Sequence, residues 1–337
     1  FDTVDQHFTH EWLDNVGSAL NGRKPDYLIV QHMEPDHSAN IDNFVKTYPD
    51  VTVVGNAKTF AMMEQFFGCA YENRLVVKDG DTLTTGRHTF TFVFAPMVHW
   101  PEVMMTYEAT EKILFAADGF GKFGALDVEE EWANEARRYY IGIVGKYGPQ
   151  VQAVLKKAAG LDIQTICSLH GPVLKENLGF YLEKYDKWSS YQPEESGVVI
   201  AYASVYGNTR NAAEYLADVL QEKGQKTVLY DLARCDKAKA VADAFRYDRL
   251  VLAGITYNGD LFPCMRSFIE GLTERNYQNR KVAIIENGTW APMTGKLILG
   301  MFEKSKNLTF TETKVSIKSA MNAQNKEEIG KLAEELS

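Results

Sequence analysis

Short apolar runs and helix-spaced apolar stretches follow one another through the first half of the chain. Continuous or alternating runs predict strands, and apolar residues recurring every three or four positions predict helices. The predicted strands are 27–30, 51–54, 75–78, 88–96, 103–107, 113–117 and 165–169. The predicted helices are 9–20, 41–48, 57–67 and about 129–146. This order predicts an α/β layer with a mixed sheet.

The second half alternates more regularly. Its predicted strands are 198–203, 227–232, 249–255, 281–285 and 308–315, and its predicted helices are 210–222, 238–245, 264–272, 294–302 and 326–336. Five strands alternating with five helices favour a doubly wound parallel sheet. The segment 191–197 breaks both periodicities, so we predict two domains, 1–192 and 193–337.

Composition fits a globular protein of this size. The 337 residues are 45% hydrophobic and 24% charged, and the net charge of −9 argues against partners such as nucleic acid or anionic membrane. We find no signal peptide and no apolar run of membrane-spanning length. Four scattered cysteines without a Cys-x-x-Cys pair indicate reduced thiols, exclude a rubredoxin-type iron site within these residues, and favour a cytoplasmic location.

Candidate metal ligands gather where predicted strands end. The first strand runs into Gln-His-Met-Glu-Pro-Asp-His, and later strands end in a histidine, an aspartate and another histidine. The candidates are His32, Glu34, Asp36, His37, His99, Asp118 and His170. Singly, each is typical of a hydrogen-bonded surface or core residue. Jointly they offer four imidazoles and three carboxylates, a set suited to two iron, manganese or zinc ions sharing one carboxylate.

A polar loop follows the first strand of the second half, where backbone N–H groups and hydroxyls can surround a phosphate. It lacks a Walker lysine and a Gly-x-Gly-x-x-Gly, so one terminal phosphate is favoured over a dinucleotide. Two later strand ends join glycine to aromatics, which alone would be ordinary turns. The predicted contacts are Ser204, Val205, Tyr206, Gly207, Asn208, Thr209, Thr256, Tyr257, Asn258, Gly259, Asn287, Gly288, Thr289 and Trp290.

The metal motif resembles the metallo-β-lactamase-like domain of flavodiiron proteins. The hydrolases of that superfamily usually carry histidine where this chain has Glu34, and a carboxylate suits iron better than zinc. The resemblance implies one iron held by His32, Glu34 and His99. It implies a second held by Asp36, His37 and His170, with Asp118 bridging.

The Ser204–Thr209 loop resembles the FMN-phosphate loop of flavodoxins. Together the two halves imply an αββα sandwich of the metallo-β-lactamase type followed by a flavodoxin-like five-stranded sheet. They imply a non-haem di-iron site and FMN as cofactors. The family carries additional strands before the position matching Phe1, so we expect an N-terminal piece to be missing here.

The resemblance implies reduction of O₂ to water, of NO to N₂O, or of both. In such proteins FMN relays electrons from a separate rubredoxin or similar donor to the irons. The implied assembly is a head-to-tail homodimer or a dimer of such dimers. Trp100, beside His99, is either part of the electron path or a packing residue.

Two other functions remain open at this point. One is a dinuclear zinc hydrolase with a flavodoxin-like appendage, in which the metals activate a water. Glu34 and a redox cofactor without a hydrolytic task count against it. The other is a flavin-containing redox sensor or electron carrier with a structural metal site. A seven-ligand set without thiolates counts against that function.

Overall fold

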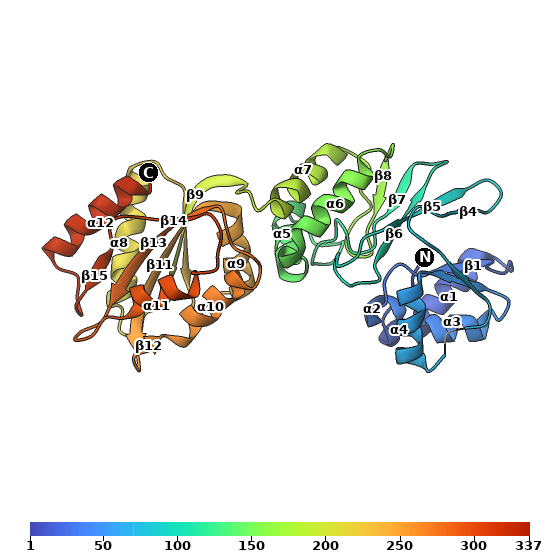
Figure 1. Cartoon of the computed structure of the whole chain (residues 1–337), viewed down its shortest axis with the longest axis horizontal. Coiled ribbons are helices and arrows are strands. Elements are labelled where there is room, and N and C mark those ends of the chain that lie inside the picture. The colour runs from blue at the N-terminus through green and yellow to red at the C-terminus, as the bar shows by residue number, and fades with distance from the viewer. Residues whose placement is uncertain (70) are drawn as a thin grey trace. The chain divides into compact units, whose positions relative to one another are not determined.

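A computed structural model describes residues 1–69 and 71–337. They form two compact units, Phe1–Trp132 with Pro149–Tyr185 and Ala133–Gly148 with Asp186–Ser337. Figure 1 shows their elements along the chain. The second unit includes 133–148, which lies inside our first predicted domain, and the boundary after residue 192 stays a prediction. Among the described residues, no helix is both long and apolar enough to span a bilayer.

The first unit opens with a small parallel sheet ordered β1-β2-β3, with β1 at Tyr27–Ile29, β2 at Thr52–Gly55 and β3 at Arg74–Val76. Its helices are α1 (Thr9–Leu20), α2 (Pro35–Ser38), α3 (Ile41–Thr47) and α4 (Ala57–Phe67). The Asn56 side chain caps α4 by accepting from the N–H groups of Lys58 and Thr59. These helices and strands enclose one apolar core around Leu28 and Val53.

A second sheet of the same unit is mixed, as predicted. Its order is β4-β5-β6-β7-β8, antiparallel from β4 to β7, with β8 parallel to β7. The strands are β4 (Thr82–Thr84), β5 (Thr89–Phe94), β6 (Met104–Glu108), β7 (Ile113–Phe115) and β8 (Thr165–Cys167). Three of them, β5, β7 and β8, run directly into segments that carry candidate ligands.

The helix predicted over about 129–146 is confirmed as the shorter α5 (Trp132–Ile143), which is followed by a 3₁₀ turn at Gly145–Tyr147. Two helices, α6 (Gly148–Ala158) and α7 (Leu178–Ser189), were not predicted. Pro149 fits the first turn of α6, where no N–H is needed. Gly148 allows the backbone to approach the Ser189 carbonyl and the Tyr191 ring so closely that a Cβ would clash.

The second unit is a doubly wound parallel sheet, ordered β10-β9-β11-β13-β14. These strands are β9 (Glu195–Tyr202), β10 (Thr227–Asp231), β11 (Tyr247–Tyr257), β13 (Arg280–Asn287) and β14 (Leu308–Phe310). The predicted strand 308–315 is two short strands, β14 and β15 (Val315–Ile317), both parallel to β13. A short β12 (Asp260–Leu261) pairs antiparallel with β11.

Helices cover both faces of this sheet (Figure 1). On one face lie α8 (Asn208–Glu222) and α12 (Ala323–Glu335), which pack with β9, β11, β13 and β15 into one apolar core. On the other lie α9 (Lys237–Arg246), α10 (Pro263–Thr273) and α11 (Thr294–Met301). Right-handed crossovers between parallel strands require this two-sided arrangement.

Helix α5 is tied to this unit by two arginines. Arg275 donates from Nε to the Ile141 carbonyl at 2.9 Å and from Nη2 to the Gly142 carbonyl at 3.3 Å. Arg137 forms a buried ion pair with Glu194, whose Oε1 also accepts from Trp188 Nε1 at 2.6 Å. These contacts account for the placement of α5 with the second unit.

Candidate functional site

The structure brings all seven predicted metal ligands together at one end of the first unit. His32 and Glu34 follow β1, and α2 carries the next two candidates. The other three follow β5, β7 and β8. They form two groups whose ligand atoms lie within 4.8 Å of one another, namely His32, Glu34, His99 and Asp118, and Asp36, His37 and His170.

In the first group, two imidazoles face two carboxylates. His99 Nε2 lies 3.0 Å from Glu34 Oε2 and 3.1 Å from Asp118 Oδ2. His32 Nε2 lies 3.2 Å from the same Glu34 oxygen and 3.5 Å from the same Asp118 oxygen. Four ligand atoms therefore converge on one small volume.

In the second group, His37 Nε2 and His170 Nε2 lie 3.0 Å apart, and Asp36 Oδ2 is 3.3 Å from each. Asp118 Oδ1 completes the set, 3.2 Å from His37 and 3.7 Å from His170. The two oxygens of Asp118 thus face different groups. This is the arrangement required of a carboxylate that bridges two cations.

Two observations indicate that these imidazoles and carboxylates fit a pair of metal ions. Asp36 Oδ1 and Asp118 Oδ1 are buried and accept no hydrogen bond from the described residues. Buried carboxylate oxygens normally have partners, and a cation would serve as one. Ring nitrogens and carboxylate oxygens also form a mixed set that suits iron.

The electrostatics favour positive charge in the site. Burial opposes a charge on His32, but the carboxylates of Glu102 and Glu34 outweigh it and raise the His32 pKa to about 10. Hydrogen bonds from His32 and His99 lower the pKa of Glu34 to about 2. The pKa of Asp118 is also lowered, because the neighbouring imidazoles of His37 and His99 overcome the effect of burial. Protons or metal cations can supply this charge.

One residue of the site, Glu102, was missed by the sequence analysis. Its Oε1 accepts from the Met33 N–H at 2.9 Å and lies 2.8 Å from His32 Nδ1. Its carbonyl accepts from Asn56 Nδ2 at 2.6 Å. The sequence shows a glutamate three residues after His99. Its contact with His32 depends on how two distant loops pack.

The predicted phosphate loop and both later strand ends line one pocket of about 660 Å³ in the second unit. The loops follow β9, β11 and β13, at the carboxyl edge where α/β sheets bind ligands. Of the predicted contacts only Gly207 is not part of the lining. Four residues missed by the sequence analysis also line the pocket: Ile255, Ala291, Met293 and Ser319. Ser319 lies just after β15, after the end of the predicted strand 308–315. A search for polar residues after every predicted strand could therefore have found it.

Local geometry in this pocket suits a phosphate. Gly207, with φ of 90°, is the N-cap of α8, a conformation that glycine adopts most readily. The Gly207 N–H is 3.2 Å from Ser204 Oγ. Thr209 is 1% exposed, and its hydroxyl has no hydrogen-bond partner in the described part of the chain. An unpaired buried hydroxyl at a helix N-terminus can donate to a phosphate oxygen.

Two aromatic side chains in this pocket are almost fully exposed. Tyr206 is 93% exposed and Trp290 is 90% exposed, whereas Tyr257 is 48% exposed. Exposed aromatics beside a pocket can stack on a planar ring or contact a partner. The pocket therefore offers a phosphate end and an aromatic end.

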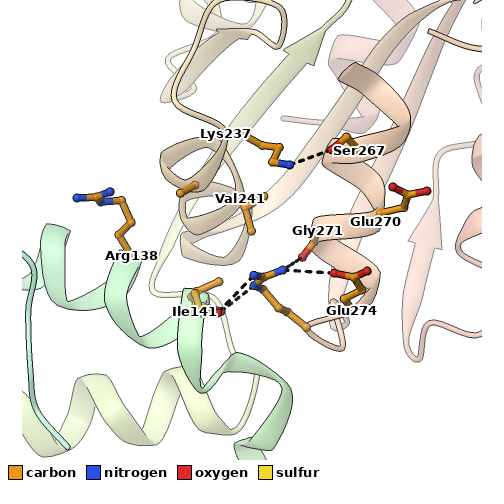
Figure 2. Close-up of a pocket in the computed structure, with 11 residues that line it drawn as sticks. Arg138, Ile141, Lys237, Val241, Ser267, Glu270, Gly271 and Glu274 are labelled. Atoms are coloured by element: carbon orange, nitrogen blue, oxygen red, sulfur yellow. Dashed lines mark hydrogen bonds and ion pairs between the residues drawn. The ribbon is translucent and has the colours of Figure 1, made fainter. Parts of the chain in front are cut away.

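A second pocket of the same unit, of about 350 Å³, lies among α5, α9 and α10 (Figure 2). Two of its cationic side chains contact other residues of the lining. Lys237 donates to Ser267 Oγ at 2.8 Å, and Arg275 lies near Glu274. Three cationic side chains, Arg138, Lys237 and Arg275, and two anionic ones, Glu270 and Glu274, line the pocket, a mixed set that favours no particular class of ligand.

A lactamase-type layer with two candidate metal-binding groups, followed by a flavodoxin-type sheet with a pocket at its carboxyl edge, is the arrangement of a two-domain redox class of protein. The model of the ODP family beta lactamase matches residues 1–171, more than half of the chain, and a flavodoxin domain matches residues 199–315. The chain belongs to the flavodiiron protein family.

Individual relatives agree with this assignment. The anaerobic nitric oxide reductase flavorubredoxin of Salmonella paratyphi B is 28% identical over 303 residues, covering 86% of this chain and 63% of the relative. A variant of the flavo di-iron protein from Thermotoga maritima is 25% identical with a TM-score of 0.88, covering 100% of this chain and 86% of that one. Rubredoxin oxygen:oxidoreductase from Desulfovibrio gigas shares the fold, with 24% identity, a TM-score of 0.92 and coverage of 99% and 86%.

Proposed function

We propose that this protein is an oxidoreductase that reduces O₂ to water, NO to N₂O, or both. The observation that carries the proposal is Asp118, whose two oxygens face two metal-binding groups in a chain that also has a phosphate pocket with aromatic residues. When bound, a di-iron pair would supply the electrons and open positions for reducing the gas, and FMN would relay electrons to it. Relatives named nitric oxide reductase and oxygen oxidoreductase support this function.

The first iron would be held by His32, Glu34 and His99, and the second by Asp36, His37 and His170. Asp118 would bridge them. His32 and Asp118 are buried, whereas the side chains of Glu34, Asp36 and His170 are 36%, 39% and 34% exposed. These residues therefore leave an open side through which a diatomic gas can enter.

FMN would bind in the pocket of the second unit. Ser204, Thr209 and the N–H groups at the start of α8 would bind its phosphate without a cationic side chain. Tyr257 and Trp290 would lie against the isoalloxazine ring. The other predicted contacts would complete the site.

The electron donor would be a separate rubredoxin or a similar protein, and the working assembly a head-to-tail homodimer in the cytoplasm. Trp100 remains a candidate for the electron path, since its ring packs edge-on against His32 with 5.3 Å between centroids. Replacing Trp100 with phenylalanine keeps a ring in place. Unchanged flavin-to-iron electron transfer in this variant would assign Trp100 to packing alone.

The deciding experiment combines metal analysis with gas consumption. Protein purified without oxygen should contain two irons and one FMN per chain and, once reduced, consume O₂ or NO. Asp118→Asn is the matched variant, with nearly unchanged volume and no bridging charge, and it should lose iron and activity. Two zinc ions with no gas consumption would instead support the hydrolase alternative.

A further inference from the structure

We infer that Glu102 is a positioning residue for the metal centre, which orients the His32 ring so that Nε2 faces the metal. Glu102 and His32 side chains are both 0% exposed, and His32 Nδ1 is 2.8 Å from Glu102 Oε1. An ionised carboxylate only accepts hydrogen bonds, so the ring proton lies on Nδ1 and the Nε2 lone pair remains for the metal. This inference rests on the proposed metal site.

Hydrogen bonds hold both the side chain and the main chain of Glu102 in place. Its Oε1 also accepts from the Met33 N–H, next to His32, and its carbonyl accepts from Asn56 Nδ2. Asn56 caps α4, so Glu102 links the strand exit, the loop of His99 and a helix start through its side chain and its main-chain carbonyl. A ligand held in this way loses little freedom when metal binds.

A purely structural role fits Glu102 poorly. Its Oε2 is buried and lacks a hydrogen-bond partner among residues 1–69 and 71–337. A buried charge with an unsatisfied oxygen destabilises the fold, and an apolar side chain of similar volume would serve packing better. The carboxylate is therefore better explained by its effect on His32 as a ligand.

The same unit contains a matched control. Glu108 is 3% exposed and also pairs with a histidine, with Oε1 3.2 Å from His88 Nδ1. Unlike in Glu102, both carboxylate oxygens accept from backbone donors: Oε1 from the Thr110 N–H at 2.8 Å and Oε2 from the Glu111 N–H at 2.6 Å. His88 is not in either metal-binding group.

The test measures binding of Co²⁺ by metal-stripped full-length protein. We expect Glu102→Ala to weaken the affinity of the first group by about 10–100-fold, as is typical when the partner of a ligating histidine is lost. Glu102→Gln keeps an acceptor oxygen, so it should weaken Co²⁺ binding less than Glu102→Ala does. Glu108→Gln should leave Co²⁺ affinity unchanged, whatever its effect on thermal stability.

A second measurement follows the His32 ring proton by NMR in the Zn²⁺-loaded protein, which is diamagnetic. In Glu102→Gln this proton should shift and exchange faster, and in Glu108→Gln it should not. If Glu102→Ala does not fold, the NMR signal of the His32 ring proton in Glu102→Gln tests the inference. An unmoved signal, or Co²⁺ affinities equal to those of Glu108→Gln, would overturn the inference. A parent protein that binds no Co²⁺ would overturn the metal site as well.

Discussion

At the scale of single residues, the candidate metal centre brings ionised carboxylates and imidazoles together without a bound ion. The carboxylates of Glu34 and Asp118 have lowered pKa values, while the imidazoles of His32, His99 and His170 have raised ones. Burial alone would suppress ionisation of all five groups. Their mutual attraction overcomes burial, so the unloaded site holds protons that a metal must displace.

Metal affinity should therefore rise with pH. The folded-state pKa of His32 is raised from 6.5 to about 10, so a neutral ring, the form that binds metal, becomes more populated as pH rises through this window. We expect the apparent Co²⁺ affinity of metal-stripped protein to increase steadily from pH 6.5 toward 10, with proton release on binding. Titrations in buffers of different ionisation enthalpy measure both quantities. A flat affinity across this window would contradict the prediction.

In the second unit, replacing Thr209 tests whether the pocket binds a phosphate. Thr209→Val keeps the shape of a buried side chain but removes its donor. A hydrogen bond to a charged group contributes about 1.5–3 kcal/mol, so FMN should bind roughly 10–100-fold more weakly. Quenching of flavin fluorescence measures this. Thr59, also buried with an unpaired hydroxyl, is the control. Equal FMN affinity in Thr209→Val and Thr59→Val would count against the phosphate site.

At the scale of elements, loops at strand ends provide the chemistry and helices fix those loops. The strand β13 begins with Arg280, which is 3% exposed. Its guanidinium donates to the carbonyls of Tyr247 at 2.8 Å and Tyr191 at 2.7 Å, and also to that of Phe245. One side chain thus joins β13 to the start of β11, the end of α9 and the segment before β9.

Removing this guanidinium should destabilise the second unit. Arg280→Met keeps much of the apolar stem but leaves several buried carbonyls without donors, each costing about 1–3 kcal/mol. We expect a total loss of about 3–5 kcal/mol, comparable with breaking a buried charge network. Urea unfolding measures the loss. Arg266→Met is the control, because Arg266 is 38% exposed and pairs with exposed Asp260 at the surface. Equal losses in both variants would contradict the prediction.

At the scale of the whole molecule, the two binding sites belong to different compact units. Each site is built from its own unit's side chains, so loading of one site should not depend on ligands of the other. We expect Asp118→Asn to lose iron and keep a full complement of FMN. We expect Thr209→Val to lose FMN and keep its iron. Iron assay and flavin absorbance on the same samples measure this. Loss of both cofactors in either variant would show that the sites depend on each other.

The sequence by itself determined the class of fold and the chemistry available at the strand ends. Each of His99, Asp118 and His170 follows the end of a predicted strand, so the sequence alone could associate them as candidate ligands. The same rule located the loop at Ser204–Thr209. The mixed sheet and the doubly wound sheet followed from the periodicity of apolar residues, which is a local property of the chain.

Only the tertiary structure decided what depends on contacts between distant segments. That Glu102 meets His32 and that Asp118 directs one oxygen to each candidate metal-binding group both depend on how separate loops pack. The break between α5 and α6 and the division of 308–315 into β14 and β15 also escaped prediction. In each case the local pattern allows several conformations, and packing against residues far along the chain selects one.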